Sequence, residues 1–166
     1  VLVRVEETLK RAFDNNASLL DIALNRLTFG KALMQQAIAE HSTDFNPAMK
    51  YLHQAVAGLR DAGQQQYLPL GLLARASLYR VQGDFDNAWT DLEEVREIAE
   101  QGHMQLHLTD YHLEACRTLL IQEQVQGLAA KQAEFDQHLE QAKQLIEQTG
   151  YHRRDDELSA LIDVSK

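Results

Sequence analysis

Four side chains that could bind a metal or act as a nucleophile lie between residues 103 and 116. His103 and His107 are four residues apart, and so are His112 and Cys116. Residues four apart on a helix share a face, so the two histidines could ligate zinc. The second pair could place a thiolate beside an imidazole, which is how cysteine nucleophiles are activated. The chemistry to consider is therefore zinc binding or cysteine-dependent catalysis.

The spacing argues against both kinds of chemistry. His112 lies five residues beyond His107, on another face of the helix, and no Cys or carboxylate is placed to complete a tetrahedral set. The repeat described below puts Cys116 at a helix crossing, where a small apolar residue is needed and a substrate has no access. We therefore expect structural histidines, a buried thiol, no catalytic residue, no metal and no cofactor.

Composition narrows the class of protein further. The 166 residues fit one domain spanning 1–166, and 45% of them are hydrophobic and 25% charged, as in globular proteins. The net charge of −9 argues against general binding to nucleic acid or to anionic membranes. No apolar stretch approaches the roughly 18 residues of a membrane span. We expect a cytoplasmic protein. Because the chain starts with Val1 inside a helix-like stretch, we also expect a fragment of a longer protein.

The elements that position these residues are predicted to be helices. Two prolines and abundant Ala, Leu, Gln and Glu favour an all-α fold, and no stretch alternates between apolar and polar residues as a strand would. Glycines recur where helices should end. The predicted helices span about 4–14, 17–39, 46–62, 67–81, 85–101, 105–125, 129–149 and 155–163.

An internal repeat relates these helices. Residues 44–48 and 84–88 both combine an aspartate cap, an aromatic residue and a helix start, forty residues apart. The preceding helices carry a small residue, Gly30, Ala76 or Cys116, that lets two helices approach closely. A pair this narrow cannot bury its apolar face alone, so the pairs should stack into a right-handed helical solenoid. The predicted units are repeats at about 17–63, 67–102 and 105–150 and a cap at 151–166.

One copy resembles a tetratricopeptide repeat. It combines a small residue, an aromatic residue, a Gly-Asp-aromatic turn and an alanine, here Ala76, Tyr79, Gly83, Asp84, Phe85 and Ala88. The resemblance implies about three tetratricopeptide-like helix pairs, with an additional N-terminal helix and a C-terminal capping helix. The other copies depart from the motif through a longer loop at 39–43 and an insertion at 123–131. Helical repeats of the HEAT type are therefore an alternative.

A narrower resemblance covers most of the chain. Residues 68–76, 98–107 and 149–155 are similar to the C-terminal repeat region of bacterial signal-transduction ATPases of the STAND class. In that class the repeats follow a nucleotide-binding motor and sense a ligand or partner, so the resemblance implies a sensor arm. The 166 residues contain no Gly-x-x-x-x-Gly-Lys-Ser/Thr phosphate loop, so the ATPase would lie outside them.

Stacked pairs of this kind line a concave groove with the first helix of each pair. Helical spacing predicts that nine side chains face the groove: Leu27, Lys31, Met34, Leu73, Ser77, Arg80, Leu113, Arg117 and Leu120. The three basic residues would suit a carboxylate-bearing peptide or an acidic partner segment. The alternative is that they are ordinary solvated or ion-paired residues.

The C-terminal residues are predicted to be structural. Opposite charges in residues 153–157 favour the start of the last helix, and Leu158, Leu161 and Ile162 would cover the last repeat. We therefore expect a non-catalytic module that binds a protein or peptide segment in the groove. The alternative is a small-molecule-sensing arm of a transcription regulator, for which a deep, enclosed pocket is expected instead of an open channel.

Overall fold

A computed structural model describes residues 18–126 and 132–164, and these residues are almost entirely helical. They form α2 (Leu19–Ala39), α3 (Asn46–Asp61), η1 (Gln65–Tyr67), α4 (Leu68–Gln82), α5 (Phe85–Gln101), α6 (Gln105–Gln126), α7 (Gln132–Thr149), η3 (His152–Arg154) and α8 (Asp155–Val164). No strand occurs in these two ranges, so the all-α prediction is confirmed.

The predicted helix bounds agree with the observed ones to within two residues wherever both can be compared. The predicted helix at 4–14 and the predicted helix start near 129 lie outside the described residues. In the described ranges, no helix is both long and apolar enough to cross a membrane.

Local chemistry explains where the helices begin and end. The Asp84 carboxylate caps α5 by accepting a hydrogen bond from the Asn87 amide at 3.3 Å, as predicted. The cap predicted at Asp44 is wrong: α3 begins after Phe45 without a side-chain cap, and Asp44 instead accepts from the Asn46 amide at 3.0 Å.

Gly83 ends α4 with a φ of 77°, in the left-handed region where a Cβ is unfavourable. Gly102 ends α5, as the glycine spacing predicts, but without a left-handed conformation. The left-handed residue there is His103 (φ 51°), whereas Gly102 has a φ of −87°.

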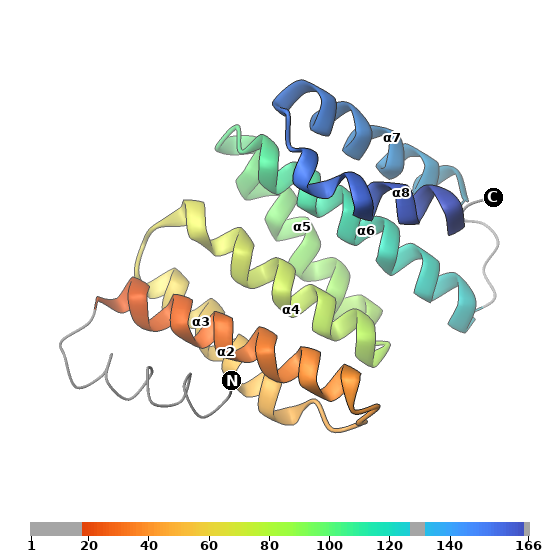
Figure 1. Cartoon of the computed structure of the whole chain (residues 1–166). Coiled ribbons are helices and arrows are strands. Elements are labelled where there is room, and N and C mark those ends of the chain that lie inside the picture. Colours follow the sequence, from red (N-terminus) through yellow and green to blue (C-terminus); the bar gives the residue numbers. More distant parts are fainter. Residues whose placement is uncertain (1–17, 127–131, 165–166) are drawn as a thin grey trace.

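The helices are arranged in one row with a second set behind it. In Figure 1, α2, α4, α6 and α8 run in roughly the same direction, and each contacts the next member of this row. The helices α3, α5 and α7 pack against the row, and the closest packing joins α2 to α3, α4 to α5 and α6 to α7. Helices that follow one another in the chain are thus neighbours, and one face of the row is left for other contacts.

Close approach within a pair depends on small residues. Gly30 on α2 is buried against Leu52 on α3, and a Cβ at Gly30 would lie 2.7 Å from Leu52 Cδ2 and 3.2 Å from the Leu52 amide nitrogen. The equivalent residues of the repeat, Ala76 and Cys116, have no exposed surface. All three are buried, as the repeat register predicts.

A buried ion pair joins the two helices of the middle pair. The Arg75 guanidinium on α4 donates two hydrogen bonds to the Asp91 carboxylate on α5, at 2.8 and 2.7 Å. A third nitrogen lies 3.2 Å from His53 Nδ1 on α3. Burial and the positive charge of Arg75 lower the pKa of His53, which keeps this imidazole neutral and able to accept the hydrogen bond. The contact thus links three helices.

Substitution of Gly30 tests the close approach of α2 and α3. Alanine favours helix over glycine by about 1 kcal/mol. We nevertheless expect Gly30→Ala to lower stability by about 1–3 kcal/mol, because the new methyl group would overlap the fully buried Leu52. Urea denaturation should show a lower midpoint for this variant. Thr28→Ala, at an exposed position of the same helix, is the control and should change little. An unchanged or higher midpoint for Gly30→Ala would contradict the packing described here.

Candidate functional site

A groove of about 300 Å³ crosses the row of helices α2, α4 and α6 and ends at α8. We call it the row groove. It is lined by Lys31, Met34 and Gln35 of α2, Leu70, Leu73, Ala74 and Ser77 of α4, Asp110, Leu113, Glu114 and Arg117 of α6, Arg154 of η3 and Glu157 of α8. Met34, Ala74 and Leu113 are buried and form an apolar floor, whereas Lys31 and Gln35 are exposed at the edge.

Six of the nine residues predicted from helical spacing line this groove: Lys31, Met34, Leu73, Ser77, Leu113 and Arg117. The other three do not. Leu27 belongs to the apolar core formed by α2, α3 and α4, and Leu120 packs against the core formed by α6, α7 and α8. Arg80 turns toward α6 and binds Glu114. The groove therefore lies nearer the N-terminal ends of α4 and α6 than the prediction placed it.

The remaining lining residues were missed for two different reasons. Five of them lie on or next to the predicted helix faces: Leu70 and Asp110 lie one turn before predicted positions, and Gln35, Ala74 and Glu114 each directly follow one, so a wider face would have included them. Arg154 and Glu157 carried no such signal, because they reach the groove from the segment after α7. The charged run 153–157 is therefore more than a helix start.

Charged side chains form a continuous chain of ion pairs that starts at Arg80, outside the groove, and continues along one of its walls. Arg80 Nε donates to Glu114 Oε1 at 2.7 Å, and Arg117 Nη1 donates to Glu114 Oε2 at 3.1 Å. Arg117 also donates to Glu157, which in turn accepts a hydrogen bond from Arg154. Arg154 Nε reaches Asp110 Oδ1 at 2.8 Å. Two of the three predicted groove cations, Arg80 and Arg117, are thus neutralised by the protein itself.

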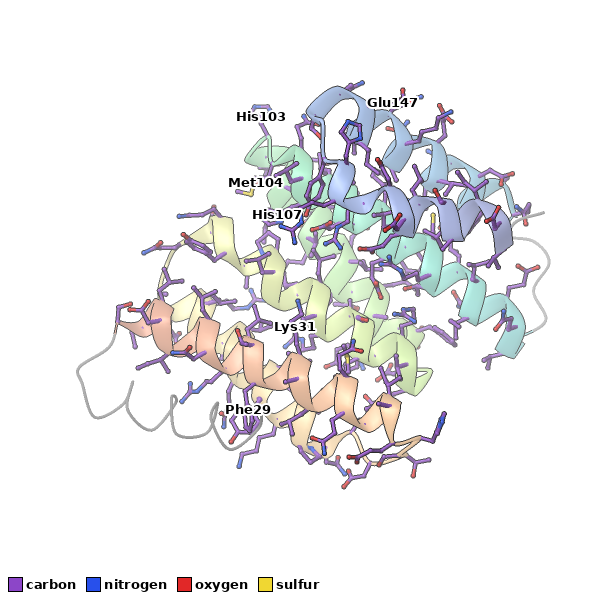
Figure 2. The ribbon with its side chains drawn as sticks, viewed as in Figure 1. Phe29, Lys31, His103, Met104, His107 and Glu147 are labelled. Atoms are coloured by element: carbon purple, nitrogen blue, oxygen red, sulfur yellow. The ribbon has the colours of Figure 1, made fainter. Side chains whose placement is uncertain are left out.

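Lys31 differs from these arginines. It lies between α2 and α4 at the exposed edge of the groove (Figure 2). No ion pair joins it to another side chain in the part of the chain that the structure describes. An exposed ammonium group at a groove edge is available to an anionic group from outside.

The three histidines considered for zinc have different surroundings. His103 extends from the turn before α6, and His107 lies farther along, near η1 (Figure 2). His107 Nε2 lies 3.1 Å from the Gln66 carbonyl oxygen, whereas His112 faces α7. Across the described ranges, no group of three or more His, Cys, Asp or Glu side chains is arranged to hold a metal ion.

His112 forms a direct contact that the sequence did not predict. Its Nδ1 lies 2.8 Å from Nδ1 of His138 on α7, so one ring donates a hydrogen bond and the other accepts it. The Tyr111 ring packs against both imidazoles, and the Trp89 ring centroid lies 6.4 Å from that of His138. Burial, and then the neighbouring His138, lower the pKa of His112 from 6.5 to about 4. The pair is therefore neutral near pH 7.

Cys116 is a poor nucleophile in this structure. It has no exposed surface, and its thiol donates to the Phe135 carbonyl oxygen on α7 at a sulfur–oxygen distance of 3.8 Å. Burial raises the pKa of the Cys116 thiol from 9.0 to about 12. The imidazole of His112 is engaged with His138 and does not activate the thiol. The chemistry of this cluster is that of helix packing.

Comparison of the chain with family models, curated proteins and solved structures gives no match.

The histidine pair predicts a dependence of stability on pH. In the unfolded chain His112 takes up a proton near pH 6.5, whereas in the folded protein its pKa is about 4. The free energy of unfolding is therefore largest above pH 6.5 and falls as the pH is lowered below that value. His138 and His53 shift in the same direction. We expect urea denaturation to show a loss of about 2 kcal/mol between about pH 7.5 and about pH 5. His112→Gln should weaken this dependence. Equal pH profiles for the two proteins would contradict the assignment.

The buried thiol predicts slow alkylation of the native protein. With its pKa raised from 9.0 to about 12, the thiolate fraction near neutral pH should be about a thousandfold lower than for a free thiol. Intact-mass measurement should show that iodoacetamide leaves Cys116 unmodified in the native state and modifies it fully in guanidinium chloride. Added glutathione serves as the internal control. Native-state alkylation as fast as that of glutathione would restore Cys116 as a candidate nucleophile.

Proposed function

We propose that this chain is a non-catalytic interaction module that binds a segment of a partner protein in the row groove. One observation carries the proposal. A single open groove crosses the corresponding helix of three successive pairs, α2, α4 and α6. An extended peptide can contact all three helices in turn, with apolar side chains on the floor and charged groups at the edge.

The proposed architecture is a right-handed solenoid of three tetratricopeptide-like pairs closed by α8. The close packing within the pairs α2–α3, α4–α5 and α6–α7, and the small buried residues at their crossings, support this architecture. Leu158 and Leu161 of α8 are buried against the last pair, and Ile162 packs beside them, as expected of a cap. The proposed place in a larger bacterial signalling protein, as its sensor arm, rests on the sequence resemblance.

A small-molecule sensor is the second candidate, and the groove favours a peptide over it. Pockets for small molecules usually enclose most of the ligand within about 300–1,000 Å³. The row groove has about 300 Å³, and Lys31 and Gln35 on one edge are exposed. A groove of this kind suits side chains of an extended segment better than a metabolite that must be surrounded.

Blocking the groove tests this proposal. Ser77 lines the groove on the middle helix, so Ser77→Trp should fill it. Peptides selected against the wild-type protein from a phage-displayed random library should bind Ser77→Trp at least about tenfold more weakly, measured by fluorescence polarisation. Thr90→Trp, at an exposed position of α5, is the matched control and should retain binding.

Two results would contradict the proposal. The first is that the selected peptides bind Ser77→Trp as tightly as the wild-type protein. The second is that both tryptophan variants weaken binding equally, since the effect would then not come from the groove. Urea denaturation of both variants establishes that they remain folded.

A further inference from the structure

The carboxylate of Glu157 lies between two arginines that come from different parts of the chain. Arg117 of α6 and Arg154 of η3 each donate a hydrogen bond to it, one to each oxygen. All three side chains line the row groove. Partial burial alone would raise the pKa of Glu157, but the hydrogen bond from Arg154 and the positive charge of Arg117 lower it. The two guanidinium groups therefore form a site for an anion, and Glu157 fills it.

Each arginine is also held by a second carboxylate that does not depend on Glu157. Arg117 Nη1 donates to Glu114 Oε2 at 3.1 Å, and Arg154 Nε donates to Asp110 Oδ1 at 2.8 Å. These contacts leave Arg117 Nη2 and Arg154 Nη1 directed at the same carboxylate. If Glu157 moved away, the two guanidinium groups would keep their positions, and the anion site would remain formed.

Exposure identifies Glu157 as the replaceable member of the chain of ion pairs. The side chain of Glu114 is 8% exposed and that of Asp110 is 13% exposed, whereas Glu157 is 34% exposed. Removing a buried carboxylate from its arginine is costly, because an unpaired charge is left in the interior. A partly exposed carboxylate can exchange its partner for water at small cost.

We propose that Glu157 is an internal substitute for an acidic group of the partner, and that a carboxylate of the bound segment replaces it at Arg117 and Arg154. This inference rests on the proposed function and specifies its ligand as an acidic peptide segment. Exchange of one carboxylate for another at the two arginines contributes little binding free energy by itself. The gain comes from a second acidic residue that reaches Lys31 across the groove, and from apolar contacts with the floor.

The exchange also couples binding to the last helix. Glu157 is on α8, which is held to the rest of the structure by the apolar residues Leu158 and Leu161 and by the ion pair of Glu157 with Arg117. An acidic segment that takes the place of Glu157 removes this ion pair and keeps the apolar contacts. Binding is thus limited by competition with the protein's own side chain.

A gain of binding tests the proposal. Fluorescein-labelled hexaglutamate serves as the acidic probe, and hexaglutamine of the same length as the uncharged one. Glu157→Gln should bind hexaglutamate about tenfold more tightly than the wild-type protein, with no change for hexaglutamine. Glu157→Ala, which removes the competing acceptor altogether, should show at least the same gain. Because the expected result is tighter binding, loss of folding cannot imitate it.

The control removes the same charge from the same helix. Asp156 is exposed and precedes Glu157, so Asp156→Asn should change hexaglutamate affinity by no more than about twofold. Adding Arg117→Gln to Glu157→Gln should abolish the gain.

The proposal is overturned if Glu157→Gln shows no gain or if Asp156→Asn shows the same gain. Loss of peptide binding in Ser77→Trp, together with no gain in Glu157→Gln, would retain the groove as a docking site and reject the role of Glu157. A gain in Glu157→Gln, together with unchanged peptide binding in Ser77→Trp, would retain the anion site and reject groove docking.

Discussion

Apolar burial is shared between neighbouring helix pairs throughout the described residues, and the rest of the structure depends on this sharing. One core joins Ala23 of α2 to Val95 of α5 and Tyr111 of α6. A second joins α6, α7 and α8, and a third joins α2, α3 and α4. A pair of amphipathic helices is too thin to remove its apolar surface from water, so each pair takes part of its core from the next.

This shared core fixes which helix faces remain available for binding. Because α3, α5 and α7 cover one side of the row, the side chains on the other side of α2, α4 and α6 line a groove. Gly30 contributes by letting α2 and α3 approach until no Cβ fits between them.

Electrostatic pairing completes the arrangement. Asp91 is almost fully removed from solvent and Arg75 is largely so, and the two bind each other through two hydrogen bonds, which offsets much of the cost of burying them. At the groove wall, Glu114 pairs in the same way with Arg117 and with Arg80, which lies outside the groove. The arginines expected to make this groove basic are paired with carboxylates of the protein itself. An acidic ligand therefore has to compete with those carboxylates.

Local sequence signals predicted the helices well, because caps, glycines and apolar spacing act within a few residues. Asp84 and Gly83 mark a helix boundary in the sequence and form it in the structure. The same spacing predicted that Gly30, Ala76 and Cys116 would be buried, since the helical period fixes which residues share a face. Periodicity also placed Lys31, Ser77 and Arg117 on the face that lines the groove.

The amino-acid sequence by itself determined which residues form helices, where those helices stop and which of their faces are apolar, because these properties depend on neighbours along the chain. Only the tertiary structure decided which side chains meet across helices. His112 and His138 are 26 residues apart, and Arg117 and Glu157 are 40 apart. Helical period gives the direction of each side chain on its own helix, but not the element that packs against it. The position of α8 beside α6 therefore decided that Arg117 pairs with Glu157 inside the groove.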